Sequence, residues 1–231
     1  MDDFETYGFE LLQAVVTEEE LNHLHDALRE HEMSGPGLRH LLTRNETIRQ
    51  FASSPSLLEI ARKRLGPHVI PVKAILFDKT AESNWYVTWH QDLTIAVREK
   101  IEQEGFGPWS MKDGVQHVQP PAAVLENMIA LRIHLDPCAE GNGAISFIPG
   151  SHNSGKLDAE QIVAWREKQE PISCPANQGD VIVMRPLILH SSGKASKHEH
   201  RRVLHIEYAS AGLPGGLQWS EASALDVSNV H

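Results

Sequence analysis

The sequence predicts a mainly β protein in which N-terminal helices precede a double-layered β-barrel. Residues 1–67 show helical spacing and helix caps, whereas residues 68–210 are rich in β-branched and aliphatic residues in period-two stretches. Several of these strand candidates separate a His-x-Asp pair, His90 and Asp92, from a later histidine, His190. A double-layered barrel needs that order, because its two sheets are built from strands far apart in the chain.

Length and composition are those of a globular protein. The 231 residues are 41% hydrophobic, enough to bury a sizeable core, and most simply form one domain, 1–231. The net charge of −10 disfavours nucleic acid and anionic membranes as partners, because both select basic surfaces. No segment has the pattern of a signal peptide or the apolar length of a membrane span. With only Cys138 and Cys174 as thiols, we expect a cytoplasmic protein.

The N-terminal part begins with a weak strand signal and a clear helix start. Apolar and polar residues alternate over 4–16 enough to predict a short strand there. Thr17, with Glu20 three residues later, forms a capping box that opens a helix. Three leucines at helical spacing mark the buried face of that helix: Leu21, Leu24 and Leu28.

Residues 35–67 are expected to form a loop and two short helices. Ser54 and Pro55 are typical of the start of the second helix, and Gly66 with Pro67 ends it. In a barrel of this kind such helices cover the outer face of the major sheet.

The first two barrel strands are expected over 68–79 and 85–92. Side chains two apart on a strand point the same way and lie about 6.5 Å apart along the chain. His90 and Asp92 therefore converge from one face, which Tyr86 shares. Two lysines of the first strand, Lys73 and Lys79, could reach a cosubstrate or substrate, although a charge at a strand end is more often solvated.

Residues 98–121 are irregular and rich in Gly, Pro and charge. A loop of this length inside a compact domain is usually a functional lid or a disordered segment. We expect a lid beside the site, with Trp109 and Met111 as the apolar side chains that close over a substrate.

Residues 123–136 are expected to form a strand with an outward apolar face made of Ile129, Leu131 and Ile133. Arg132 then points into the barrel, where an unpaired guanidinium would be costly. It needs either an internal carboxylate or an anionic cosubstrate or substrate.

The C-terminal third continues with a turn at 139–143, a surface helix over 158–168 and a strand over 181–190 that ends in His190. In the last strand, 200–210, parity places Arg201 on the polar inner face. A tail over 211–231 is Gly-, Ser- and Ala-rich and is expected to be poorly ordered.

Three His-x-Asp/Glu sequences occur, against about two expected by chance from 14 histidines and 31 acidic residues. They are His90-Gln91-Asp92, His134-Leu135-Asp136 and His205-Ile206-Glu207. The third has no histidine at a plausible later spacing. The second is a genuine competitor, but Asp136 runs into Pro137 at a strand end.

The pair His90 and Asp92, completed by His190, makes a two-histidine, one-carboxylate set of metal ligands. That set leaves open coordination positions and is typical of non-haem Fe(II) oxygenases. Arg201 follows His190 by eleven residues and offers a fixed cationic fork for a carboxylate.

Four motifs in this order carry a resemblance to a known family: WHQDLTIAV, GNGAISFIPGSH, GDVIVMRPLILHSSG and a downstream arginine. Over about residues 69–210 the chain resembles the phytanoyl-CoA dioxygenase family of Fe(II)- and 2-oxoglutarate-dependent oxygenases. The resemblance implies a double-stranded β-helix, also called a jelly-roll or cupin-like barrel, with N-terminal helices packed on its major sheet.

The same resemblance implies the chemistry. Fe(II) would be held by His90, Asp92 and His190, and the far carboxylate of 2-oxoglutarate by Arg201 with help from Ser192. With O2, such an enzyme releases succinate and CO2 and hydroxylates an unactivated C–H bond. Related halogenases lack the carboxylate ligand, so its presence here favours hydroxylation or another oxidation. The acidic charge favours a small free metabolite, such as an amino-acid derivative or secondary metabolite, as substrate.

Two other functions are compatible with parts of this pattern. The same ligands could hold Zn(II) or Mn(II) in a cupin-like hydrolase or isomerase. The barrel could also be a non-catalytic binding module. Arg201 in register with the distal histidine argues against the first, and an intact ligand set argues against the second.

Overall fold

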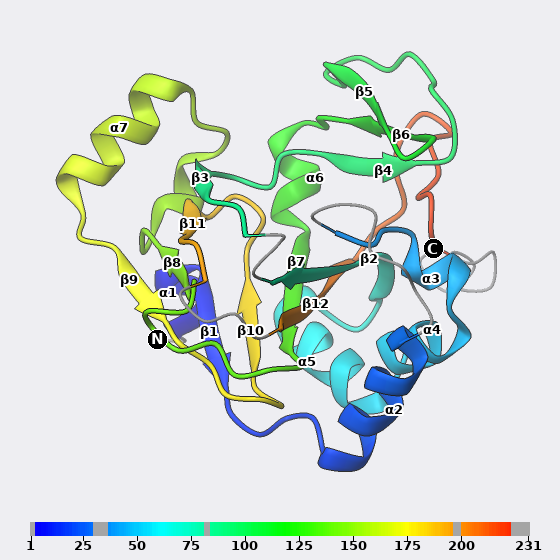
Figure 1. Cartoon of the computed structure of the whole chain (residues 1–231). Coiled ribbons are helices and arrows are strands. Elements are labelled where there is room, and N and C mark those ends of the chain that lie inside the picture. The colour runs from blue at the N-terminus through cyan, green and yellow to red at the C-terminus, as the bar shows by residue number, and fades with distance from the viewer. Residues whose placement is uncertain (1–2, 30–36, 81–83, 196–199, 223–231) are drawn as a thin grey trace.

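A computed structural model describes residues 3–29, 37–80, 84–195 and 200–222 (Figure 1). Two antiparallel sheets form its centre. The larger sheet has the strand order β1 (Phe9–Leu12), β10 (Val181–Met184), β7 (Met128–His134), β12 (Arg201–Ala209) and β2 (Ile70–Lys79). The smaller sheet has the order β3 (Val87–His90), β11 (His190–Ser192), β8 (Ile145–Phe147) and β9 (Ile172–Cys174).

Sequential strands of the barrel alternate between these two sheets, except that β8 and β9 both lie in the smaller one. From β2 the chain passes to β3 in the smaller sheet, to β7 in the larger, to β8 and β9, and then to β10, β11 and β12 in turn. This alternation is the topology of a jelly roll. The predicted double-stranded β-helix is therefore confirmed.

Helices cover the outer face of the larger sheet, as Figure 1 shows for those in blue and cyan. Thr17 and Glu20 form the predicted capping box, and the three leucines of the helix behind it are buried. Ser54 and Gly66 flank another helix as predicted. Three helices form where two were expected. The helices of this layer are α1 (Asp3–Tyr7), α2 (Glu18–Arg29), α3 (Leu41–Arg44), α4 (Glu46–Ala52) and α5 (Pro55–Leu65).

The two faces of the larger sheet divide apolar from polar side chains. Three isoleucine and leucine residues of β7 and three residues of β12 pack against the helices: Ile129, Leu131, Ile133, Leu204, Ile206 and Tyr208. Tyr208 donates its hydroxyl to the Ala52 carbonyl at 2.7 Å, which ties β12 to α4. The expected strand over 123–136 is shorter at its start, because α6 (Ala122–Glu126) precedes β7. Helix α7 (Ala159–Lys168) forms as predicted, capped by Asp158.

The predicted inner face of β3 is correct at His90, which lines the central cavity, and wrong nearer the start of the strand. The strand ends at His90, and Asp92 lies beyond it. His190 pairs with His90 while Ser192 pairs with Val87, so β3 advances three residues where β11 advances two. This bulge exchanges the two faces of β3. Val87 consequently lines the central cavity, and Tyr86 is 55% exposed.

The predicted irregular loop over 98–121 contains a β-hairpin over residues 109–118. A third sheet contains β4 (Ile95–Val97), β6 (Val115–Val118) and β5 (Trp109–Lys112) in that order. Lys112 pairs with Val115 across a two-residue turn, Asp113 and Gly114, both with positive φ. Asp-Gly is among the strongest sequence signals for such a turn.

Two predictions near the C-terminus need correction. The expected strand over 181–190 is divided into β10 and β11, because the chain crosses between the sheets at Arg185–Leu189. Residues 211–222 of the expected tail are ordered, with Trp219 3% exposed and bridged to Val97 of β4. Residues 223–231 lie outside the described part. No described helix has the length and apolar character to cross a membrane.

Candidate metal centre

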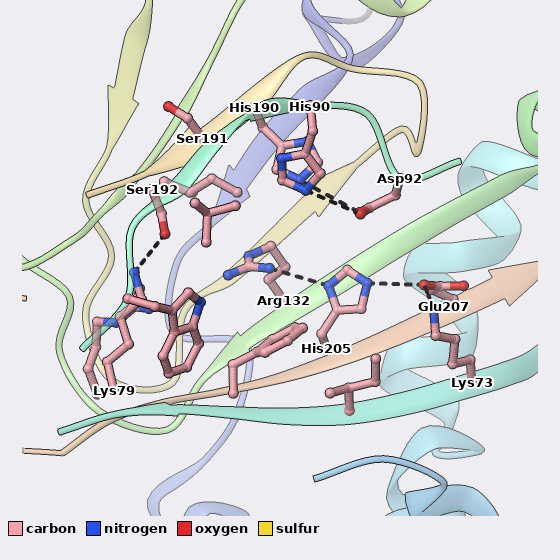
Figure 2. Close-up of a pocket in the computed structure, with 16 residues that line it drawn as sticks. Lys73, Lys79, His90, Asp92, Arg132, His190, Ser191, Ser192, His205 and Glu207 are labelled. Atoms are coloured by element: carbon pink, nitrogen blue, oxygen red, sulfur yellow. Dashed lines mark hydrogen bonds and ion pairs between the residues drawn. The ribbon is translucent and has the colours of Figure 1, made fainter. Parts of the chain in front are cut away.

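Three side chains converge at the edge of the smaller sheet. His90 and His190 are cross-strand partners on β3 and β11, with ring centroids 4.2 Å apart. Asp92 faces both: its carboxylate oxygens lie 3.7 Å from the Nε2 atom of each imidazole. The donor atoms of the three residues lie within 4.8 Å of one another. Figure 2 shows the two rings and the carboxylate directed at one point.

Backbone contacts position Asp92 after β3 has ended. Its amide donates to the Pro186 carbonyl at 2.9 Å. The neighbouring Gln91 is buried and donates its side-chain amide to the Leu187 carbonyl at 2.6 Å. The His-x-Asp segment is thus attached to the chain that leads into His190.

Hydrogen bonds fix which imidazole nitrogen is free. Nδ1 of His90 lies 2.9 Å from the Thr88 carbonyl, and Nδ1 of His190 lies 2.9 Å from the Ile188 carbonyl. Because a carbonyl can only accept, each Nδ1 carries the hydrogen and each Nε2 presents a lone pair. The distance of 3.7 Å from Nε2 to Asp92 is too long for a hydrogen bond. The three donors therefore fit a shared cation.

Electrostatics keep the donors in the form that a metal requires. Burial alone would raise the pKa of Asp92, but nearby His190, His205, His90 and Lys73 hold it below its ordinary value. Burial lowers the pKa of His190 to about 4, despite the opposing effect of Asp92. At neutral pH the centre offers a carboxylate and a neutral His190 imidazole.

A cationic pair lies in the same cavity, where β2 and β12 pair. Lys79 and Arg201 are cross-strand partners, and both line the cavity. Arg201 donates to the Gly143 carbonyl at 2.8 Å, and its buried Nε has no hydrogen-bond partner. Within the described residues, neither cation forms an ion pair with a carboxylate. A ligand carboxylate would supply the missing charge.

Lys79 was expected at a solvated position but is 1% exposed. It donates to the Ser192 hydroxyl at 2.9 Å (Figure 2). It also donates to the Gly193 carbonyl at 2.7 Å. Burial, followed by the charge of Arg201, lowers its pKa to about 7. The structure thus brings Arg201 and Ser192 together with Lys79, for which the sequence left a site role open but favoured a solvated position.

A chain of polar side chains crosses the larger sheet below the metal centre. Arg132 points inward as predicted, and its Nη1 lies 3.4 Å from Nδ1 of His205. Nε2 of His205 lies 3.4 Å from Glu207, which pairs with Lys73 at 2.7 Å. Figure 2 shows the four side chains in one row. Neither the buried Lys73 nor this role of His205 and Glu207 was expected.

Strand parity could have located this row. Lys73 shares parity with Lys79 on β2, and His205 and Glu207 share parity with Arg201 on β12. Arg132 has no carboxylate partner among the described residues, and burial lowers its pKa to about 10.

The competing metal pair is not assembled. Asp136 accepts from Nε and Nη2 of Arg202, both at 2.8 Å. His134 lies within the larger sheet, and burial lowers its pKa to about 3. Among the described residues, only the cluster of His90, Asp92 and His190 has the geometry of a metal site.

The hairpin contributes to the site differently from the prediction. Trp109 packs into an apolar cluster with Ile95 and Val118 and does not line the cavity. Met111 is 64% exposed. Lys112 and His117 instead line a second cavity that also contains His90 and Asp92.

Comparisons with known proteins agree with this geometry. A model of the phytanoyl-CoA dioxygenase (PhyH) family matches residues 4–203. No curated protein matches the chain. The solved structures that it resembles include SnoN, an epimerase from nogalamycin biosynthesis, in complex with Fe3+, alpha ketoglutarate and nogalamycin RO. That match has 18% identity and a TM-score of 0.69, and covers 93% of this chain and 88% of SnoN.

Two further structures show the same fold. EctD from S. alaskensis, with 2-oxoglutarate and 5-hydroxyectoine, is 16% identical with a TM-score of 0.69, covering 90% of this chain and 73% of EctD. The carbocyclase SnoK is 15% identical with a TM-score of 0.68, covering 90% of this chain and 81% of SnoK.

Proposed function

This chain belongs to the phytanoyl-CoA dioxygenase family, and from that membership we propose that it is an Fe(II)- and 2-oxoglutarate-dependent oxygenase. One observation carries the proposal. A cavity contains, at one side, two imidazoles and a carboxylate with converging lone pairs and, at the other, the buried cations Lys79 and Arg201.

In this proposal His90, Asp92 and His190 hold Fe(II), which when bound supplies the O2-dependent decarboxylation of 2-oxoglutarate to succinate and CO2 and the oxidation of a substrate. The carbonyls of Thr88 and Ile188 keep each Nδ1 protonated, so that the imidazoles present Nε2 to the metal.

Arg201 binds the far carboxylate of 2-oxoglutarate, assisted by Lys79 and the Ser192 hydroxyl. A carboxylate is the partner that two buried, uncompensated cations lack. Apolar side chains of the cavity wall exclude water from this pairing: Ile75, Phe77, Trp85, Val87 and Ile145.

The reaction proposed for the substrate is hydroxylation of an unactivated C–H bond. Asp92 occupies the position that halogenases leave free for chloride, which disfavours halogenation. The similar structures include an epimerase and a carbocyclase. We place this chain with the hydroxylases because hydroxylation needs no feature beyond the ligand set.

Turnover of 2-oxoglutarate tests the function without knowledge of the substrate. Wild-type protein with Fe(II), ascorbate and O2 should release succinate slowly, His190→Ala should release none above background, and His23→Ala on the exposed face of α2 should match wild type. Folded wild-type protein that binds Zn(II) tightly but never consumes 2-oxoglutarate would favour a non-redox metalloenzyme.

A further inference from the structure

A second cavity adjoins the metal centre on the side of the β5–β6 hairpin. Its volume is about 390 Å³, within the range of small-molecule sites. It shares five lining residues with the first cavity: Lys73, Ile75, Phe77, His90 and Asp92. Arg39, Lys112 and His117 line only this second cavity, whereas Lys79 and Arg201 line only the first. A substrate lying here would reach the metal centre without displacing 2-oxoglutarate from those two cations.

Charge in these cavities is opposite to that of the whole chain. The chain has 21 basic and 31 acidic residues. Yet the two cavities are lined by six basic residues, Arg39, Lys73, Lys79, Lys112, Arg132 and Arg201, and by two acidic ones, Asp92 and Glu207. Such a local reversal favours an anionic ligand.

Lys112 is the cation of the second cavity with the weakest compensation. Its Nζ donates to the Thr94 hydroxyl at 3.4 Å, and within the described chain it forms no ion pair. Lys73, by contrast, is paired with Glu207. The Lys112 side chain is exposed, and desolvation beside the cavity, then the charges of Lys73 and Arg39, lowers its pKa. An anion beside Lys112 would offset the repulsion from these two cations.

Arg39 can join Lys112 at little cost. It donates to Asp113 of the hairpin turn at 2.9 Å, and the Asp113 side chain is 53% exposed. Exposed ion pairs contribute little to stability. A substrate anion can therefore replace Asp113 as the partner of Arg39 without a large loss. Ile75, Phe77 and Leu93 give the same cavity an apolar wall.

We propose that the second cavity is the substrate subsite and that Lys112, with Arg39, binds a carboxylate or phosphate group of a small substrate whose apolar part lies against Ile75 and Phe77. The inference rests on the proposed function, because it assigns the substrate of the same metal centre. The recognition chemistry is that of an ammonium and a guanidinium for an oxyanion.

Binding of matched probes tests this subsite. Full-length protein is loaded anaerobically with Fe(II) and saturating 2-oxoglutarate, which fills the Arg201 side, and titrated with hexanoate, hexyl phosphate and hexanamide by ligand-observed NMR. Wild type should bind one or both acids at least about tenfold more tightly than the amide. The acid that binds more tightly shows whether the subsite prefers a carboxylate or a phosphate group. Lys112→Met should abolish the preference and Lys112→Arg should retain it.

The controls separate this inference from the proposed function. Lys100→Met, an exposed lysine outside both cavities, should bind like wild type. Equal binding of acid and amide, or a preference for acid that survives in Lys112→Met, overturns the subsite. It does so even if Fe(II) and 2-oxoglutarate together give the visible charge-transfer band expected of their complex, which would support the oxygenase function. The opposite outcome is also distinguishable. If metal-free Arg201→Met protein still prefers the acids through Lys112, the subsite is supported. If wild-type protein with Fe(II) and 2-oxoglutarate then shows no visible absorption band, the oxygenase function is overturned.

Discussion

Lys79 and Arg201 are like charges placed directly opposite each other on neighbouring strands, an arrangement that destabilises a sheet. The carbonyls of Gly193 and Gly143 and the Ser192 hydroxyl offset part of that cost. The remaining charge is best explained by a ligand carboxylate.

The affinity for 2-oxoglutarate should fall as pH rises from 7 to 9. The pKa of Lys79 is about 7 in the free protein, so the ammonium is lost over this range, and a bound carboxylate favours the protonated form. Lys79→Met should flatten the pH dependence and weaken binding about tenfold at pH 6.5. Dissociation constants measured at several pH values check this. A wild-type affinity that is level from pH 6 to 9 would exclude Lys79 from the cosubstrate site.

Gly143→Ala should weaken 2-oxoglutarate binding but not metal binding. Gly143 has φ of +73°, and a Cβ there would lie 2.8 Å from the Gly193 carbonyl oxygen. A backbone shift that relieves this contact would displace the Gly143 carbonyl, which binds Arg201, or the Gly193 carbonyl, which binds Lys79. Separate titrations with Mn(II) and with 2-oxoglutarate should show the second affinity reduced severalfold. Gly114→Ala is the matched control, because its φ of +78° is also positive but a Cβ there has no neighbour within 4 Å.

Sequence parity predicts part of the site at this scale. Arg201 and Arg132 point inward because period-two alternation on β12 and β7 is regular. The buried state of Lys79 could not be predicted from its own strand, because β11 of the other sheet encloses it. Tyr86 faces outward because of a bulge that only pairing with β11 reveals.

At the scale of elements, the C-terminal segment 211–222 fastens the hairpin sheet to the helical layer. Trp219 is bridged to Val97, and Glu221 accepts from the backbone amide of Leu42 in α3 at 3.1 Å. Glu221 is 5% exposed, and burial raises its pKa to about 7. His40 lies 3.8 Å away, and Lys73 and Glu207 also act on this carboxyl.

The buried Glu221 should make stability fall as pH rises from about 4.5 to 7. Over this range the folded carboxyl, with its raised pKa, binds more protons than the unfolded one. Glu221→Gln removes this loss, so it should exceed wild type by about 2 kcal/mol in free energy of unfolding at pH 8 and match it near pH 4.5. Urea titrations at both pH values check the difference. Equal wild-type and variant stabilities at pH 8 would show that folding does not raise the pKa of this carboxyl.

The elements that escaped prediction share a physical cause. The Asp113-Gly114 turn was readable, but its flanking strands are short and polar and give a weak alternation. Residues 211–222 look disordered by composition. Trp219 is ordered because it packs against the apolar side chains of β4 and its neighbours. The helices and long barrel strands were predictable because their signals are local: caps, helical spacing and period-two runs.

At the scale of the whole molecule, the metal centre links segments a hundred residues apart. His90 ends β3 and Asp92 follows it, whereas His190 begins β11. A cation held by all three binds the folded state and not the unfolded chain, so it stabilises by mass action. The order of motifs predicted the jelly roll because that topology brings the second and seventh barrel strands together.

Mn(II) should therefore raise the melting temperature of wild-type protein in a concentration-dependent way, by several degrees at a hundredfold excess over the dissociation constant. Asp92→Ala should lose the effect while His23→Ala retains it. Thermal unfolding at graded Mn(II) concentrations, with EDTA as reference, measures it. An identical shift in Asp92→Ala would place the bound ion elsewhere.

The central claim is that one cavity holds both Fe(II) and 2-oxoglutarate, and anaerobic visible absorption tests it most directly. Adding 2-oxoglutarate to Fe(II)-loaded wild-type protein should produce the weak charge-transfer band of the chelate. The band should be absent in His90→Ala and should need at least about tenfold more 2-oxoglutarate in Arg201→Ala. Absence of a band in wild type, combined with tight binding of Zn(II) or Mn(II), would contradict the account and leave a non-redox metal site.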